Sequence, residues 1–563
     1  MNAISRKLKE FEMERGMPAT AIGVKEAKLA FAHVSFALVA LLIGGLCGLL
    51  QTLVRTGVIP EIAGVGYYEL LTAHGLMLAI VFTTLFIFGL LFAFLGQSFG
   101  RFEEFPRRLG WVGFWFMMLG VVLVTWMVLA GEASVLYTFY APLKAHPVFY
   151  IGLVIFVIGT WISSGAMFRM YADYKREHKG VHPPLQAYMS IMTVLLWVVA
   201  TLGVAATILF QLLPLSLGWT DKVGIELSRT LFWYFGHPLV YFWLLPAYIV
   251  WYTVIPKIVG GKIFSDALAR MSFLLFLLFS FPVGFHHQLL EPGISAFWKY
   301  IQVVLTFLVI IPSLMTAFSM FATFELAGRR QGATGWFGWI KKMPYRDVRF
   351  LAPFVGMLFF IPAGAGGVIN ASHQLNIVVH NTLWVTGHFH ITVGAAVALT
   401  FFGTAYWLVP LLRGRTLTKK INRIGLLQTA TWTIGMLFMS TAMHISGLLG
   451  NPRRTGPAAY FKDSLVADWI PYHVAMAIGG TILFLSILLF LFAMFQLAFR
   501  APKGVEEFPV AETEEAAMQT PLFFENWKLW IFMTFALIAF AYTVPIWHMI
   551  ESAPPGAPGW KLW

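Results

Sequence analysis

The stretch 70-LLTAHGLMLAIVFTTLFIFGLLFAFLG-96 decides the fold class, because it contains no Lys, Arg, Asp or Glu. At about 1.5 Å per residue, a helix of this length crosses the roughly 30 Å hydrocarbon core of a bilayer. Backbone polar groups in lipid must be satisfied within the segment, so a helix is predicted here. Similar runs recur through the 563 residues, of which 59% are hydrophobic and 12% charged. We therefore expect an all-α polytopic membrane protein.

Hydropathy predicts about thirteen transmembrane helices joined by short connections. The predicted spans are 29–54, 70–96, 109–130, 148–170, 187–214, 229–256, 270–290, 298–325, 349–368, 376–411, 424–448, 469–498 and 526–550. The chain then divides into an N-terminal segment over 1–28, a helix bundle over 29–550 and a tail over 551–563. We expect no soluble domain.

The basic residues predict the orientation of the bundle. Of the 39 Lys and Arg residues, 30 fall on the side of the spans that carries the N-terminus. Because basic residues stay in the cytoplasm, the N-terminus is predicted to be cytoplasmic and the C-terminus outside, in a prokaryotic plasma membrane. The net charge of +13 then faces anionic lipid headgroups rather than nucleic acid. The single cysteine, Cys47, excludes a disulfide framework and a cysteine-bound metal cluster.

Six histidines fall within predicted spans, roughly 5–20 Å below the outer face on the predicted orientation. They come from four spans and are His74, His237, His286, His287, His388 and His390. A lone histidine in a membrane helix is more often a hydrogen-bonding partner of its neighbour. Six at one depth indicate metal binding, since neutral imidazole is the commonest metal ligand. Adjacent rings at a helix end, such as His286 and His287, can both reach one ion.

Spacing separates the histidines further. His388 and His390 are two residues apart, about 200° around a helix, so we expect them to serve different centres. Tyr241 follows His237 by one helical turn, which lets the two rings touch. Pro238 removes a backbone donor beside the histidine and can distort the helix there.

The motifs 73-AHG-75, 236-GHPLVY-241, 286-HH-287 and 388-HFH-390 resemble the signature of subunit I of the haem–copper oxygen reductases. They occur in the family's order and span most of the chain. The resemblance implies that His74 and His390 bind a low-spin haem, and that His388 is the proximal ligand of a high-spin haem. His237, His286 and His287 would hold the copper ion CuB. Tyr241 would be cross-linked to His237 and supply an electron and a proton for O–O cleavage.

Leu239 stands where the A-type members have a glutamate that ends a proton channel. The chain is similar instead to the B-type members, cytochrome oxidases with a low-spin haem b and a high-spin haem of a or o type. No Asp or Glu falls in the middle of a predicted span, so a proton path within this chain cannot depend on carboxylates.

Hydroxyl groups offer an alternative path. Tyr241, Tyr248 and Tyr252 lie within about 60° on one face of the predicted helix and descend toward the cytoplasm. Aromatic packing is the simpler explanation of such a stripe taken alone. Ser313 and Thr316 on the next span but one can line the opposing wall. Together with the resemblance to the B-type hydroxyl channel, this arrangement favours proton conduction.

Two adjacent arginines, Arg453 and Arg454, break the charge pattern on the outer side. In the family an arginine pair at this place binds haem propionates, which suits bidentate recognition of carboxylates. His380 and Asn381 are expected near the same propionates. A B-type relative carries an aspartate where this chain has Asn376, which is able to form hydrogen bonds but does not titrate.

The resemblance implies the catalytic subunit of a terminal oxidase that reduces O2 to water, takes protons from the cytoplasm and pumps protons. No cysteine-based CuA motif is present, so a second subunit must carry CuA and accept electrons from cytochrome c, which we favour, or bind quinol. Two alternatives stay open. Nitric oxide reductases have a similar histidine set but lack the tyrosine, and a metal or proton transporter would need histidines deeper in the membrane.

Overall fold

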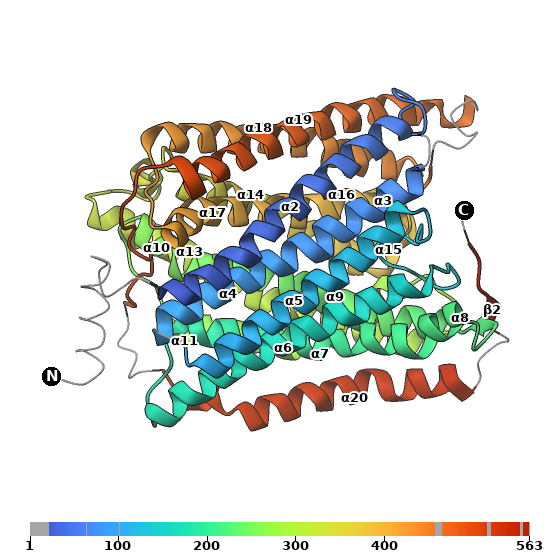
Figure 1. Cartoon of the computed structure of the whole chain (residues 1–563), viewed down its shortest axis with the longest axis horizontal. Coiled ribbons are helices and arrows are strands. Elements are labelled where there is room, and N and C mark those ends of the chain that lie inside the picture. The colour runs from blue at the N-terminus through green and yellow to red at the C-terminus, as the bar shows by residue number, and fades with distance from the viewer. Residues whose placement is uncertain are drawn as a thin grey trace.

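The computed structural model describes residues 22–62, 65–100, 102–456, 464–514, 520–551 and 556–561. Of the expected N-terminal segment 1–28, residues 1–21 lie outside these ranges. Long helices run side by side along one direction (Figure 1). Eleven of the described helical segments are long and apolar enough to cross a membrane. The chain is therefore a mostly helical polytopic membrane protein, as expected.

The helices of the first half are α2 (Val24–Arg55), α3 (Tyr67–Gly75), α4 (Thr83–Phe99), α5 (Glu104–Leu129), α6 (Pro147–Glu177), α7 (Leu185–Thr207), α8 (Leu213–Leu217), α9 (Ile225–Thr253), α10 (Ile255–Ile258) and α11 (Asp266–Phe279). Those of the second half are α12 (Ala296–Leu308), α13 (Ile310–Arg330), α14 (Val348–Ala371), α15 (His373–Val379), α16 (Leu383–Phe389), α17 (Ala398–Arg413), α18 (Lys419–Leu448), α19 (Ile470–Phe495) and α20 (Trp527–Glu551). Short π-helical turns join α3 to α4 and α16 to α17.

Two of the thirteen expected spans are not among the eleven. The expected span 270–290 is not one helix, because α11 has only 14 residues and the chain continues through a turn into a 3₁₀ helix over Gly284–Gln288. The expected span 424–448 does form a helix, α18, of 30 residues. The count of thirteen transmembrane helices therefore stays a prediction.

The tenth expected span, 376–411, begins too early. The structure has a separate short helix, α15, then a break at His380–Thr382, and α16 begins at Leu383. The break arises because Asn381 adopts a left-handed conformation with φ of 59°, and Thr382 then caps α16 by accepting a hydrogen bond from the backbone N–H of Trp384. His388 and His390 consequently lie in the first turns of their helix.

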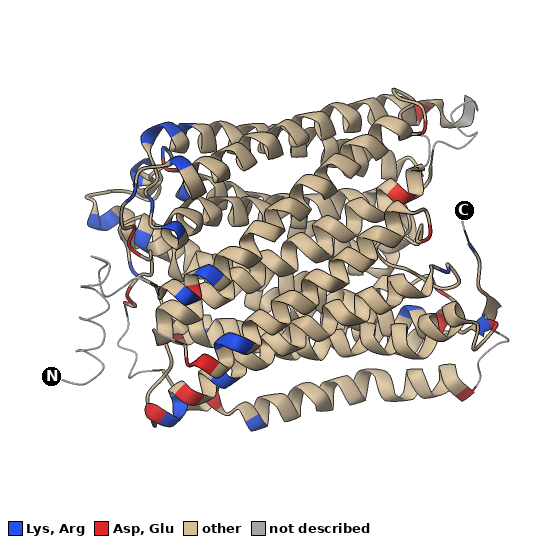
Figure 2. Cartoon of the chain, viewed as in Figure 1, with Lys and Arg blue, Asp and Glu red and all other residues tan. Residues whose placement is uncertain are grey.

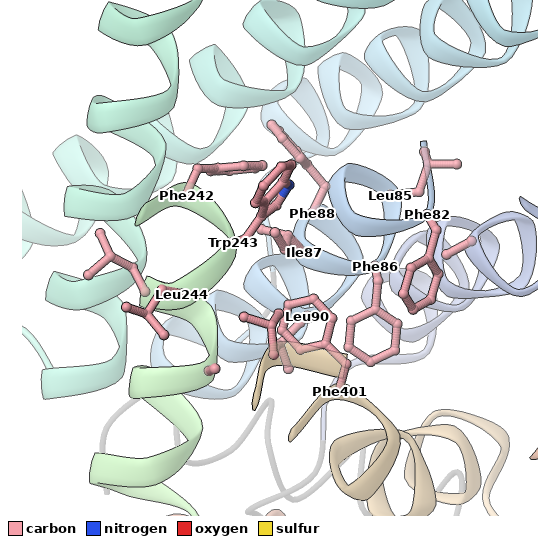
Figure 3. Packing of buried hydrophobic residues seen from close by; sticks show 14 of the residues in the cluster. Phe82, Leu85, Phe86, Ile87, Phe88, Leu90, Phe242, Trp243, Leu244 and Phe401 are labelled. Atoms are coloured by element: carbon pink, nitrogen blue, oxygen red, sulfur yellow. The ribbon is translucent and has the colours of Figure 1, made fainter. Parts of the chain in front are cut away.

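The three most buried spans form the centre of the bundle. The apolar windows of α3–α4, α9–α10 and α16–α17 are 89%, 89% and 94% buried, because these segments are apolar on every face. In Figure 3 side chains of α4 meet Trp243 of α9 and Phe401 of α17, and the Phe86 and Phe401 rings lie 4.8 Å apart. All three central segments carry histidines of the predicted site.

The two ends of the bundle differ in charge. Lys and Arg gather at the end where α2 begins, and few lie at the other end (Figure 2). At that other end, the short strand β1 (Lys222–Val223) pairs antiparallel with β2 (Ala557–Pro558), with Lys222 opposite Pro558. This pairing attaches the described part of the C-terminal tail to the connection that precedes α9.

Candidate metal centre

Three histidines from two segments meet in the interior of the bundle. Donor nitrogens of His237, on α9, and of His286 and His287, on the 3₁₀ helix, all lie within 4.8 Å of one another. His237 Nδ1 is 3.2 Å from His287 Nε2, and the His237 and His286 ring centres are 4.5 Å apart. His286 and His287 follow one another on this 3₁₀ helix, and their ring centres lie 4.1 Å apart. This grouping offers three imidazole ligands to a single ion.

Contacts around the cluster hold the rings. The His287 ring stacks on Trp233 at 3.8 Å between centres and 3° between planes. His286 Nδ1 lies 2.9 Å from Thr306 Oγ1 of α12. Sequence reasoning missed both partners, although Trp233 sits one helical turn before His237 and on the same face. Such partners orient a ligand ring and fix which nitrogen is free.

His237 Nε2 is buried and has no hydrogen-bond partner within the described ranges. A buried polar atom without a partner destabilises the fold by about 1–3 kcal/mol, so such atoms call for an explanation. The other nitrogen of this ring, Nδ1, lies 3.2 Å from His287 Nε2, where a transition-metal ion could be bound by both rings, and imidazole is the donor that copper, iron and zinc share. The residues present therefore fit a metal ion.

His74 and His390 form a second pair. Their ring centres are 6.2 Å apart and their planes differ by 11°. His74 Nδ1 lies 2.9 Å from the Gly44 carbonyl oxygen and His390 Nδ1 lies 2.8 Å from the Thr386 carbonyl oxygen. Each Nδ1 must then carry the proton, which leaves each Nε2 free as a ligand. Two metal–nitrogen bonds of about 2 Å need about 4 Å between those atoms, which this spacing can supply.

Both rings of this pair line one cavity. Its walls come from α2, α3, α16, α18 and α19, and it also includes Arg453 and Arg454. The apolar part of the wall includes Phe389, Trp432 and Met436, which suits a flat aromatic group. The cavity thus offers two imidazoles that face each other, apolar walls and cations, a donor set that would fit a haem with its propionates.

His388 lies apart from this pair, against α14. A Cβ atom at Gly366 would come within 2.7 Å of His388 Nδ1, so only glycine allows this approach. His388 is not among the residues that line the His74 and His390 cavity. Of the two histidines of 388-HFH-390, the structure places only His390 on this cavity.

Hydroxyl groups continue from the cluster along α9. The Tyr241 ring centre lies 4.8 Å from that of His237. Ser313 lies beside the Tyr248 hydroxyl, and the Tyr252 hydroxyl donates to Thr316 Oγ1 at 3.1 Å. Tyr248, Tyr252 and Thr316 are each no more than 1% exposed.

Ser272, on α11, extends this line of hydroxyls. Its Oγ atom is 3.2 Å from Thr316 Oγ1 and donates to the Pro312 carbonyl oxygen at 3.1 Å. No periodic pattern in the sequence points to Ser272, because its partners lie on a helix 40 and 44 residues further along the chain. The link depends on the packing of α11 against α13.

At the opposite end of the site, Arg453 and Asn381 lie together. Arg453 Nη2 donates to Asn381 Oδ1 at 2.7 Å, and the Arg453 N–H donates to the Asn381 carbonyl oxygen at 2.9 Å. Burial, assisted by the charge of Arg454, lowers the pKa of Arg453 to about 10. The Arg454 guanidinium lies over the Tyr140 ring at 5.1 Å. The loop thus presents two guanidinium groups, which suit the binding of an anion.

His380 belongs to a neighbouring ion cluster. Its Nε2 atom is 3.8 Å from a carboxylate oxygen of Glu291, which also pairs with Arg229 at 2.5 Å. The interaction with His380 and the charge of Arg229 hold the pKa of Glu291 below its usual range. Asn376 donates to the Asn370 carbonyl oxygen at 2.7 Å. Sequence reasoning missed Glu291, in the connection before α12, and Arg229, in the first turns of α9.

This arrangement defines a class, a polytopic membrane protein whose interior holds a cluster of three histidines and a second, stacked histidine pair. Residues 28–482 match the family described as cytochrome c and quinol oxidase polypeptide I. The chain belongs to this family, the haem–copper oxidase subunit I proteins, and is an oxidoreductase. The family implies haems, the copper CuB, O2 as a substrate and a membrane complex with other subunits.

Individual relatives agree with this assignment. The chain is 40% identical to cytochrome c oxidase subunit 1 of Thermus thermophilus, over 96% of this chain and 97% of that protein. It is 26% identical to a heme-copper oxidase subunit I+III of Aeropyrum pernix, over 75% of this chain and 50% of that protein. A solved heme-copper terminal oxidase dimer contains a chain that is 35% identical with a TM-score of 0.89, and 95% of each chain is covered.

Proposed function

We propose that this chain is the catalytic subunit of a B-type terminal oxidase, which reduces O2 to water and takes up protons from the cytoplasm. The observation that carries the proposal is the buried cluster of His237, His286 and His287 beside a parallel histidine pair. Bound haem irons and copper would supply the redox chemistry. The protein supplies ligands, orientation and protons.

The ligand assignment follows from the two groups of rings. His237, His286 and His287 would hold CuB, and His74 with His390 would hold a low-spin haem b. His388 would hold a high-spin haem of a or o type, and with one protein ligand that iron keeps a site for O2. Tyr241 lies beside His237, where it can give up a proton and an electron, whether or not the two rings are cross-linked.

The hydroxyl line supports the B-type assignment. Leu239 offers no carboxylate next to the cluster, whereas Tyr248 with Ser313, and Tyr252 with Thr316, form buried hydroxyl contacts. Hydroxyl groups both donate and accept hydrogen bonds, so such a line can relay protons. We propose that it conducts protons from the cytoplasmic end to Tyr241, and that the enzyme also pumps protons.

The positions of Arg453 and Arg454 support their assignment as partners of the haem propionates. Arg453 and Arg454 line the cavity of the histidine pair, and Asn381 accepts a hydrogen bond from Arg453. His380 lies at the same end through its contact with Glu291. We assign these four residues to the propionates and their surroundings.

The orientation follows from the charge difference between the two ends (Figure 2). We place the N-terminal segment 1–28 in the cytoplasm, the bundle 29–550 in a prokaryotic plasma membrane and the tail 551–563 outside. The donor would be cytochrome c through a second subunit that carries CuA. A quinol-oxidising complex is the second candidate, favoured by the matching family, which includes quinol oxidases.

A reduced-minus-oxidised spectrum of the purified protein, with and without CO, tests the proposal. We expect one haem that does not bind CO and one that does, together with copper and O2 uptake. A protein without haem bands would contradict the proposal and favour a transporter. Fast NO turnover with negligible O2 uptake would favour a nitric oxide reductase, and O2 uptake with quinol but not with cytochrome c would identify the other donor.

A further inference from the structure

Three guanidinium groups line the cavity that His74 and His390 share. They belong to Arg453, Arg454 and Arg55, the last residue of α2. Arg55 is only 7% exposed. None of the three forms an ion pair with a carboxylate that the structure describes. This end of the cavity therefore concentrates positive charge without a matching negative charge from the described part of the chain.

Arg55 reaches neutral oxygen atoms of the neighbouring loop. Its Nη2 atom lies 3.3 Å from Asn451 Oδ1, 3.4 Å from the Pro452 carbonyl oxygen and 3.2 Å from Thr455 Oγ1. Its Nε atom is buried and has no hydrogen-bond partner among the residues that the structure describes. Arg454 Nη2 is likewise buried without a partner. Donors on two of the three arginines thus find no acceptor in the described part of the chain.

The loop that presents the arginine pair is held from a third helix as well. Asn451 Nδ2 donates to Ser446 Oγ at 2.7 Å and lies 2.7 Å from His473 Nε2 of α19. The backbone of Asn451 accepts a hydrogen bond from the Leu383 N–H at 2.8 Å, which ties the loop to the helix that carries His390. Arg55 therefore has a defined position relative to the histidine pair.

A buried charge is stable only when it is paired and hydrogen-bonded. Two arginines suffice for two singly charged carboxylates, so a third cation leaves a net positive charge at this centre. We propose that Arg55 is a positioning residue for the low-spin haem, a third cation at its carboxylate end that favours the reduced state. This inference rests on the proposed assignment of His74 and His390 to that haem.

The physical consequence is a change in the redox equilibrium. A positive charge near a centre that gains an electron stabilises the reduced form, and in a buried site little solvent screens it. Replacing Arg55 by a neutral residue should therefore lower the reduction potential of the low-spin haem. The high-spin haem, held by His388 outside this cavity, should respond less.

The test is a redox titration of the low-spin haem absorption band in the purified complex. We expect Arg55→Gln to lower the reduction equilibrium constant by about tenfold, which is 59 mV for one electron. Arg55→Lys keeps the charge and should stay within about threefold of the wild type. Arg413→Gln removes an equal charge at the other end of the α16–α17 segment and is the matched control. Thr455→Val removes one contact of Arg55 without changing charge.

A fall of threefold or more in Arg55→Gln that neither control reproduces supports the inference. A smaller fall, or the same fall in Arg413→Gln or Thr455→Val, overturns it while the haem assignment stands. If Arg55→Gln binds too little haem for titration, haem content becomes the measurement. Recovery in Arg55→Lys then supports the role of charge, and equal loss in both variants overturns it. Absence of a low-spin haem in the wild type would instead refute the proposed function.

Discussion

Thr316 is the junction of the hydroxyl line, so Thr316→Val tests proton conduction directly. Its Oγ1 atom accepts from Tyr252 at 3.1 Å, lies 3.2 Å from Ser272 Oγ and donates to the Pro312 carbonyl oxygen at 2.9 Å. Valine has nearly the same shape but no hydroxyl, so packing is kept while the relay is interrupted. Tyr252 and Ser272 each lose a buried hydrogen-bond partner.

The magnitude follows from these contacts. A buried polar group left without a partner is destabilised by about 1–3 kcal/mol. If a proton must cross this gap in each turnover, the barrier rises by about the same amount. At 1.36 kcal/mol for each factor of ten, O2 uptake should fall by about 5- to 150-fold. The assay is steady-state O2 consumption with an excess of an artificial electron donor.

Two variants control for other effects. Thr316→Ser keeps the hydroxyl and should retain most of the activity. Thr404→Val removes a buried threonine hydroxyl that has no hydrogen-bond partner, on α17, and should leave turnover unchanged. The haem spectra of all variants should match the wild type. Turnover of Thr316→Val within twofold of the wild type, with intact spectra, would refute conduction through this hydroxyl.

Three further predictions address the ligands and the outer ion cluster. His286→Ala removes one of three ligands, so copper content measured by elemental analysis should fall sharply while the low-spin haem band persists; full copper would contradict the cluster. A Cβ atom at Gly48 would lie 2.4 Å from His74 Nδ1, so Gly48→Ala should disturb only the low-spin haem band. A Cβ atom at Gly366 would lie 2.7 Å from His388 Nδ1, so Gly366→Ala should disturb only CO binding. The pKa of Glu291 is lowered in the folded protein, so its stabilising contribution is present above the ordinary carboxyl pKa of about 4.3 and is lost as pH falls through the lowered folded value. The difference in Tm between wild type and Glu291→Gln should therefore shrink below about pH 4. A difference that stays constant with pH would contradict a stabilising role of the Glu291 carboxylate.

Much of the fold could be predicted from the sequence, because hydropathy is a local property that each segment carries alone. The break inside 270–290 could not, since apolar residues continue past Phe279 while the backbone turns into the 3₁₀ helix. The start of α16 at Leu383 could not be predicted either, because 376-NIVV-379 is largely apolar but belongs to a separate helix. Hydropathy measures the preference for lipid and does not report where the backbone changes direction.

The candidate site also contains residues that the sequence indicates and residues that only the structure reveals. Imidazoles in apolar segments stand out in any sequence, because polar groups in lipid are costly and therefore rare. Trp233 against His287, Ser272 against Thr316 and Arg55 against the 451–455 loop do not stand out, because tryptophan, serine and arginine are ordinary at such positions. Only the side chains that they contact in the folded protein show that these residues belong to the site.

The sequence alone determined that the chain crosses the membrane many times and that histidines enter its interior from four separate stretches. Both conclusions depend on the transfer energy of individual side chains, which does not require knowledge of any contact. Only the tertiary structure decided which rings share a centre, which glycines admit them and which cations gather at one end of a cavity. Those relations join residues far apart in the chain, and packing between helices sets the distances that decide them.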